Sequence, residues 1–235
     1  MTPGIVIRGV VAAALLAVGP ARASRHEPPL FWPVEAAPDS AFASLVARLS
    51  EPGGFFDSDN LVSNERSYLH VLGRLRTIGT SGGAYVGVGP DQSFSYLVHV
   101  RPRVAVIVDI RRDNMLMQLL YKSMFELAAT RVEFLSLLFG REAPARPATF
   151  AAARPEELLD WVAEAPFDSA RARSVRERVL AQVRAFGVPL DERDVATIQR
   201  FHAEFVASGP ELRYTSIGRP PRSIYPTYRD LVLER

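Results

Sequence analysis

Two short apolar segments, each the length of a single buried strand, set narrow limits on the fold. They span residues 84–88 (AYVGV) and 104–110 (VAVIVDI), and β-forming residues dominate both. Between them, Ser93 starts a pattern typical of a short helix, and a longer helix is expected from Met115 to about Leu127. Strand, helix, strand and helix in this order predict a βαβα unit with parallel strands.

The rest of the chain reads as mostly helical. Residues 132–139 fit either a helix or a third strand, and their lack of a turn signal before Gly140 favours the helix. Further helices are expected over residues 40–49, 61–78, 155–165, 169–186 and 192–206 and at the C-terminus. An open α/β sheet normally has about five or six strands. We therefore predict an α/β fold whose Rossmann-like parallel sheet either is incomplete or has strands hidden after residue 141, followed by a largely helical C-terminal part.

Composition excludes several classes of protein. The chain has 235 residues, of which 48% are hydrophobic and 23% are charged, as in an ordinary globular protein. It has no cysteine, which excludes disulfides, thiolate zinc sites and a cysteine nucleophile. Its 28 basic and 26 acidic residues are interspersed, so we expect no nucleic-acid partner. The four histidines stand singly and are expected on surfaces or helix faces, which predicts no metal site.

The first 23 residues have the layout of a cleavable secretory signal. Arg8 supplies positive charge, residues 10–18 form an unbroken apolar run, and Ala21-Arg22-Ala23 gives the small-x-small pattern that a signal peptidase accepts. The apolar run is too short to span a bilayer, which needs about 20 residues. We expect the protein to be exported, to the periplasm or outside the cell, with no membrane span after cleavage.

The candidate site lies where the first strand ends. Gly87 and Gly89 frame a turn whose missing Cβ atoms let a ligand approach the backbone, and Asp91 and Gln92 follow it. Asp109 ends the second strand, at about the 20-residue spacing from Gly89 typical of an acid that binds a ribose. The alternative is that the glycines only make a tight turn and that Asp109 caps the next helix.

Residues 84–127 resemble the first half of a class I S-adenosylmethionine-dependent methyltransferase. Residues 57–65 (DSDNLVSNE) and the following YLHVLGRLR also resemble a set of uncharacterised proteins with this fold, so that the likeness covers about residues 55–140. The resemblance implies that Gly87, Gly89, Asp91 and Gln92 contact S-adenosylmethionine and that Asp109 accepts its ribose hydroxyls. The chain departs from that family at Tyr85, where an acid is usual, and at Asp91, which replaces a third glycine.

The predicted organisation has four segments and leaves two functions open. Residues 1–23 are the signal, 24–54 an N-terminal arm and helix, 55–140 the Rossmann-like nucleotide-binding core, and 141–235 the helical part. The first function is methyl transfer from S-adenosylmethionine to an unknown acceptor, with no catalytic residue identified. The second is that of an exported Rossmann-like protein that binds a ligand or partner without catalysis.

Overall fold

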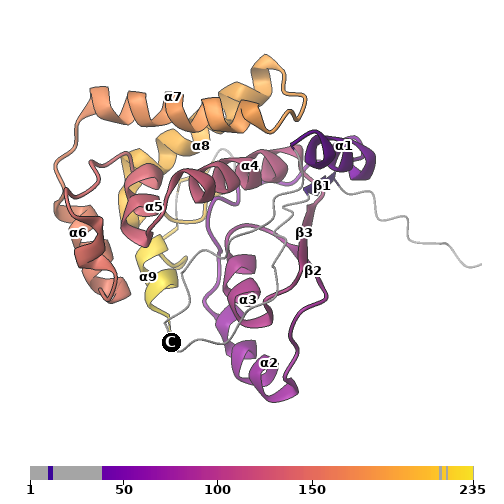
Figure 1. The fold of residues 1–235 in the computed structure, drawn as a ribbon, viewed down its shortest axis with the longest axis horizontal. Helices are drawn as coiled ribbons and strands as arrows, with labels where there is room; N and C mark the ends of the chain where they lie inside the picture. The colour runs from indigo at the N-terminus through magenta and orange to yellow at the C-terminus, as the bar shows by residue number, and fades with distance from the viewer. Residues whose placement is uncertain (1–9, 13–38, 217–218, 221, 235) are drawn as a thin grey trace, which may run out of the picture.

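A computed structural model describes residues 10–12, 39–216, 219–220 and 222–234. The described part is a mostly helical α/β structure (Figure 1). Its strands are β1 (Val10–Ala12), β2 (Ala84–Val88) and β3 (Val104–Asp109). Its α-helices are α1 (Asp39–Leu49), α2 (Leu72–Ile78), α3 (Gln92–Val100), α4 (Arg112–Leu127), α5 (Arg131–Leu138), α6 (Pro155–Glu164), α7 (Ser169–Ala185), α8 (Glu192–Ser208) and α9 (Tyr228–Leu233). Short 3-10 helices span Ser67–Val71, Pro147–Phe150 and Gly209–Glu211.

The sheet contains the two predicted strands side by side and parallel. Val88 lies opposite Val108, so the two strands end next to each other. On its other side β3 pairs antiparallel with β1, which gives the order β1-β3-β2. No further strand is present in the described residues, and the long sheet of a large α/β protein is not seen there. Most of the predicted signal segment lies outside the described residues.

Most predicted helices are confirmed, and residues 132–139 are helical within α5. The helix predicted over residues 61–78 is wrong over residues 61–66, because helical structure begins only with the 3-10 helix at Ser67 and continues in α2. The hydroxyl of Ser63 accepts a hydrogen bond from the backbone N–H of Glu65 and donates one to its carbonyl. Such local side-chain bonds compete with helical ones and favour an irregular turn.

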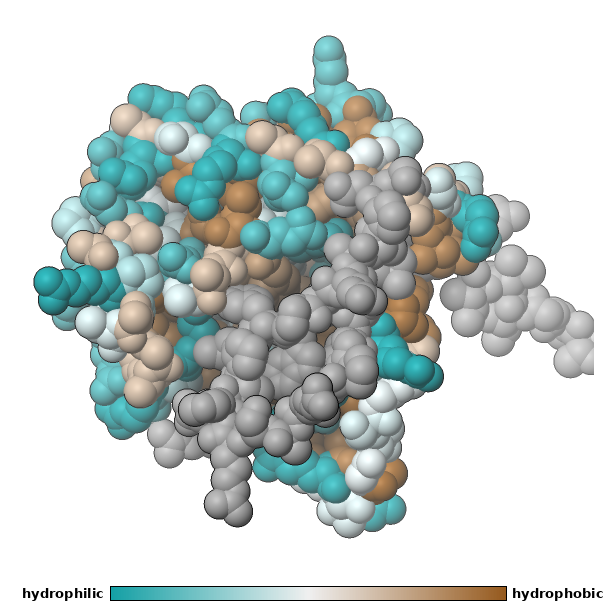
Figure 2. Space-filling view, in the orientation of Figure 1, coloured by the Kyte–Doolittle hydropathy of each residue, from teal (hydrophilic) through white to brown (hydrophobic). Residues whose placement is uncertain are grey.

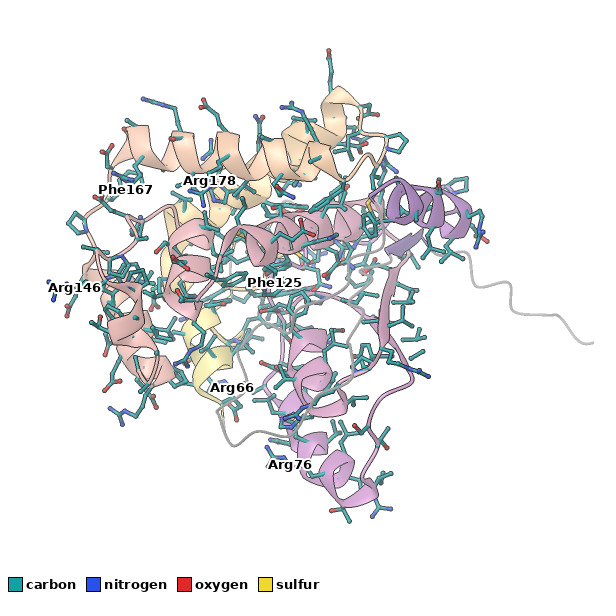
Figure 3. All side chains as sticks on the ribbon, in the orientation of Figure 1. Arg66, Arg76, Phe125, Arg146, Phe167 and Arg178 are labelled. Atoms are coloured by element: carbon teal, nitrogen blue, oxygen red, sulfur yellow. The ribbon has the colours of Figure 1, made fainter. Side chains whose placement is uncertain are left out.

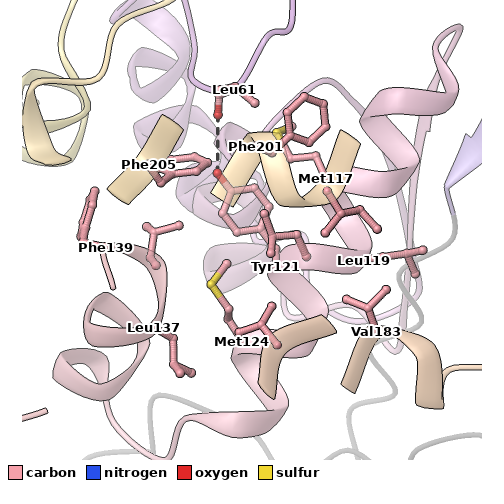
Figure 4. Packing of buried hydrophobic residues seen from close by; sticks show 14 of the residues in the cluster. Leu61, Met117, Leu119, Tyr121, Met124, Leu137, Phe139, Val183, Phe201 and Phe205 are labelled. Carbon is pink, nitrogen blue, oxygen red and sulfur yellow. Dashed lines mark hydrogen bonds between the residues drawn. The ribbon is translucent and has the colours of Figure 1, made fainter. Parts of the chain in front are cut away.

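One hydrophobic core joins the helical part of the chain to the strand–helix unit. Buried residues from Phe42 to Leu231 belong to a single cluster, in which α4 packs against α5, α7 and α8. Figure 4 shows Tyr121 of α4 in this core, with its hydroxyl donating to the carbonyl of Leu61 at 3.5 Å. Helices α7 and α8 therefore cover α4, and the sheet lies at one side of the molecule (Figure 1).

Charged side chains cover the outer face of α7, as expected for the arginines between residues 171 and 184. Arg171, Arg173, Arg178 and Arg184 are exposed, while Val179, Leu180 and Val183 face the core. Hydrophilic residues accordingly cover much of the upper part of the face seen in Figure 2, and Figure 3 shows Arg178 on this helix. Among the helices that the structure describes, none combines the length and apolar character that crossing a membrane needs.

Gly140 offers a test of this helical packing. It follows α5 with a φ of +61°, and a Cβ added there would lie 2.9 Å from Cγ2 of Val206 and 3.2 Å from Cβ of Ala172. Backbone strain and overpacking should together make Gly140→Ala lower the free energy of unfolding by about 2 kcal/mol, measured by urea denaturation. The control is Gly73→Ala in α2, where a Cβ meets nothing within 4 Å and should stabilise slightly. Equal effects of the two substitutions would contradict the packing seen at Gly140.

Candidate functional site

The parallel pairing brings the ends of β2 and β3 together at what we call the carboxyl edge of the sheet. Because Val88 pairs with Val108, the turn that starts at Gly89 lies beside Asp109. Helix α3 begins at Gln92 directly after the turn, and α4 begins at Arg112 directly after β3. Two of the predicted site features, the glycine turn and the acid, are thus neighbours, as parallel strands require.

Gly87 makes room for a side chain of its own strand. A Cβ added at Gly87 would lie 2.5 Å from the ring carbon Cε1 and from the hydroxyl of Tyr85. Residues two apart in a strand share a face, so the Tyr85 ring lies over the bare backbone of Gly87. The hydroxyl of Tyr85 lies 3.4 Å from that of Ser93 in α3. Direct approach of a ligand to Gly87 therefore requires the tyrosine ring to move.

Gly89 is needed for its backbone conformation. Its φ of +91° lies in the region that residues with a Cβ rarely adopt. Its carbonyl accepts hydrogen bonds from Nδ2 of Asn114 and from Nε2 of Gln118, both at 3.2 Å. Nε2 of Gln118 also lies 3.4 Å from the carbonyl of Pro90. The first two turns of α4 therefore hold the turn between β2 and α3 in place.

Asp109 is engaged by a residue that sequence reasoning missed. Its Oδ1 accepts hydrogen bonds from the backbone N–H of Arg111 at 2.9 Å and from Nε of Arg111 at 3.3 Å. Both side chains are buried, with 9% of Asp109 and 5% of Arg111 exposed. The carboxylate thus forms a buried ion pair at the start of α4, and Oδ1 is already occupied.

Arg111 also ties a distant loop to the carboxyl edge. Its Nη1 donates to the carbonyl of Ser58 at 2.7 Å and to that of Asp59 at 2.9 Å. The hydroxyl of Ser58 donates in turn to the carbonyl of Thr215, and the Asp59 carboxylate pairs with Arg200 of α8. The backbone of residues 58–59, which was not among the predicted site residues, therefore lies at the carboxyl edge as well.

Asn114 and Gln118, here called the amide pair, are the second feature missed from the sequence. They are four residues apart on α4 and only 1% and 3% exposed. Their oxygens, Oδ1 and Oε1, are buried and have no hydrogen-bond partner among the described residues, and the same is true of Nη2 of Arg111. Two polar residues four apart on an otherwise apolar helix face are a sequence pattern from which this buried polar pair could have been predicted.

Asp91 follows Pro90, whose carbonyl lies 3.4 Å from Nε2 of Gln118, and as a whole residue it is only partly exposed. Burial raises the pKa of its carboxyl group to about 6, and the nearby backbone N–H groups of Asp91 and Gln92 partly oppose this rise. Burial also raises the pKa of Tyr68 to about 12, and the charge of Asp91 raises it further. The pKa values of Tyr121 and Tyr228 are raised by the same two causes. Gln92 is partly buried beside Gly89.

The histidines that the structure describes are not among the residues that form the carboxyl edge. His202, expected on a helix face, is instead fully buried; its Nδ1 accepts from Nε of Arg176 and its Nε2 donates to the carbonyl of Leu137 at 2.8 Å. This burial lowers the pKa of His202. Within the described ranges, no three histidine, aspartate or glutamate side chains are placed to hold a metal ion together.

Residues 61–180 match the family model described as "Domain of unknown function (DUF7790)". The match covers about half of the chain. The chain belongs to this family. No curated protein and no solved structure gives a significant match to it. The matched region contains β2, β3, α4 and every predicted site residue, whereas Ser58 and Asp59, which Arg111 holds, precede it.

The chemistry of the carboxyl edge is dominated by hydrogen-bond acceptors. Asp91, Asp109 and the amide pair present oxygens there, while the arginine at position 111 is largely satisfied by Asp109 and by two carbonyls. Such an arrangement suits a ligand that brings hydroxyl or amino donors. It does not suit a phosphate, which needs several free donors.

Proposed function

We propose that this protein binds a nucleoside of the S-adenosylmethionine type at the carboxyl edge, within a Rossmann-like arrangement, and uses it for methyl transfer. The observation that carries the proposal is the register of β2 and β3, because it puts the Gly89 turn beside Asp109. A carboxylate at this place accepts hydrogen bonds from ribose hydroxyls in related folds. Arg111 occupies Oδ1 of Asp109, which leaves Oδ2 for the ribose.

The reaction itself would be a displacement at carbon. An electron pair of the acceptor forms the new bond to the methyl carbon, and the carbon–sulfur pair stays on sulfur, so that S-adenosylhomocysteine leaves. The protein's part in such a reaction is to bind and orient the two molecules. We propose small molecules as the partners, rather than nucleic acid, and export through residues 1–23.

The second candidate is an exported binding protein without catalysis. It is favoured by Tyr85, which stands at the position where the resembling methyltransferases carry an acid. The ring of Tyr85 lies over Gly87. That ring narrows the space over the first glycine of the turn. The first candidate requires the nucleoside site, whereas the second binds a small ligand, nucleoside or other, or a partner, and transfers no methyl group.

Calorimetric titration of the full chain with S-adenosylhomocysteine tests the nucleoside site. Asp109→Asn keeps the shape and an acceptor for Arg111 but removes the charge, so we expect at least about tenfold weaker binding, as for a lost charged hydrogen bond. Asp57→Asn, at an exposed aspartate, is the matched control and should leave the affinity unchanged.

Absence of heat at millimolar ligand would refute nucleoside binding. Binding of S-adenosylhomocysteine without turnover of S-adenosylmethionine, when amines, alcohols and carboxylic acids are offered as acceptors, would support the candidate without catalysis. Equal affinities of the wild type and Asp109→Asn would remove Asp109 from the site.

A further inference from the structure

We propose that Asp91 and the amide pair, Asn114 and Gln118, form a binding site for an organic ammonium group. The inference deepens the proposed function by naming a chemical group that the site accepts, and its binding part can be tested without a nucleoside. The ammonium belongs either to a separate small amine, a candidate methyl acceptor, or to the amino-acid end of the nucleoside ligand. Both sources present the same chemistry to the site.

The orientation of the amide pair is fixed by the turn that it holds. Both NH₂ groups donate to the carbonyl of Gly89 at 3.2 Å, so exchanging oxygen and nitrogen would bring an oxygen against that carbonyl. The oxygens Oδ1 and Oε1 are therefore acceptors that no described residue satisfies. A buried acceptor without a donor costs about 1–3 kcal/mol. A ligand that brings donors to both would recover this free energy.

Asp91 adds a carboxylate that is paired with no cation in the part of the chain that the structure describes. It follows Pro90, whose carbonyl lies 3.4 Å from Nε2 of Gln118, so that α4 runs along the turn up to the residue before Asp91. The groups that oppose the rise of its pKa are backbone N–H groups of Asp91 and Gln92, with no arginine or lysine of the described chain among them. As a whole residue Asp91 is partly exposed, whereas both members of the amide pair are buried.

Three tyrosines on different elements lie close enough to Asp91 for its charge to raise their pKa values. Tyr68 of the first 3-10 helix, Tyr121 of α4 and Tyr228 of α9 all lie within electrostatic range of Asp91. Figure 3 shows Arg66, next to this 3-10 helix, beside α9, where it pairs with Asp230 at 3.1 Å. These elements are thus held together around the carboxylate. The faces of aromatic rings attract cations.

A primary ammonium matches this set of groups better than other ligands do. It carries one positive charge and three N–H donors, and the site offers a carboxylate and two fixed amide oxygens. An anion would meet only acceptors here, apart from the single unpartnered nitrogen of Arg111. A buried water molecule could satisfy the two amide oxygens but would leave the carboxylate without a counter-charge.

The probe is propylammonium chloride, titrated at pH 8 into the full ¹⁵N-labelled chain and followed through the side-chain NH₂ resonances of Asn114 and Gln118. We expect saturable shifts of these resonances with propylammonium. Tetramethylammonium, which has no N–H donors, should bind at least fivefold more weakly. 1-Propanol, which has no charge, should cause no saturable shifts. Asp91→Asn should weaken the binding of propylammonium at least tenfold, and Gln118→Ala should weaken it at least threefold. The exposed matched controls, Asp57→Asn and Gln199→Ala, should change nothing.

Affinity should also rise with pH as Asp91 ionises near pH 6, the tyrosines around it staying neutral. Absence of saturable shifts, or unchanged affinity in Asp91→Asn, would overturn the ammonium site and leave only water there. If S-adenosylhomocysteine binds in that case, the nucleoside proposal stands by itself. If propylammonium binds but no nucleoside does, the nucleoside proposal fails and the ammonium site stands.

A competition experiment separates the two sources of the ammonium. Propylammonium is titrated into protein saturated with S-adenosylhomocysteine or with 5′-methylthioadenosine, which lacks the amino-acid part. Blocking by the first alone assigns the ammonium to the nucleoside ligand. Unchanged propylammonium binding with both assigns it to a separate amine substrate.

Discussion

Arg111→Met should lower the free energy of unfolding by about 3–5 kcal/mol, the range found when one partner of a buried ion pair is removed. Methionine keeps much of the volume of the arginine stem, so the loss comes from polar groups. Asp109 would keep a buried charge with one hydrogen-bond donor fewer, and the carbonyls of Ser58 and Asp59 would lose the guanidinium that binds them. Urea denaturation followed by circular dichroism measures the change.

Two further variants make this result specific. Arg173→Met removes an exposed arginine of α7 and should change stability by less than about 0.5 kcal/mol. Asp109→Asn, added to Arg111→Met, removes the uncompensated charge and should recover part of the loss, since contacting residues are not additive. A loss below about 1 kcal/mol for Arg111→Met would mean that the guanidinium is not the link between β3 and residues 58–59.

Asp91→Asn should have the opposite sign and stabilise the free protein by up to about 3 kcal/mol at pH 8. The pKa of Asp91 is raised from 3.8 to about 6 in the folded protein, and each pKa unit corresponds to about 1.4 kcal/mol. Because the folded state binds this proton more tightly than the unfolded state, Asp91 lowers stability as pH rises from about 4 through 6. Above that range the full cost is present, and asparagine removes it.

The pH dependence of the difference between the two proteins is the decisive measurement. Urea denaturation of wild type and Asp91→Asn should give a gap in unfolding free energy that is largest at pH 8 and shrinks towards pH 4. Comparing the two proteins at each pH cancels the titration of other groups, such as the buried His202. Asp57→Asn should show no such gap. Destabilisation by Asp91→Asn at pH 8 would show that a cation or donor already compensates the carboxylate.

Arg111→Met and Asp91→Asn together distinguish a residue that stabilises the site from one that destabilises it. Arg111 satisfies one buried carboxylate and so should stabilise the fold, whereas Asp91 has no counter-ion among the described residues and should reduce stability. Residues that reduce stability in this way are often found where a ligand binds. The contrast supports reserving Asp91 for a ligand and treating Arg111 as the tether of the carboxyl edge.

The amino-acid pattern alone determined the local elements of this protein. The runs AYVGV and VAVIVDI gave the two parallel strands, and Asp191 gave the start of α8, where its side chain accepts from the backbone N–H of Asp194. It also predicted that the Gly89 turn would lie beside Asp109. These features depend on periodicity, capping and strand order, which a reader of the chain can follow over a few tens of residues.

Only the tertiary structure decided how the site's polar groups are partnered. The Tyr85 ring over Gly87, the capture of Asp109 by Arg111, and the turns that replace residues 61–66 of the helix predicted over residues 61–78 were not foreseen. The same holds for the amide pair, which bonds the Gly89 carbonyl from about 25 residues further along the chain. Partners of this kind are chosen by burial and by contacts between distant segments, and these arise only once the core around α4 has packed.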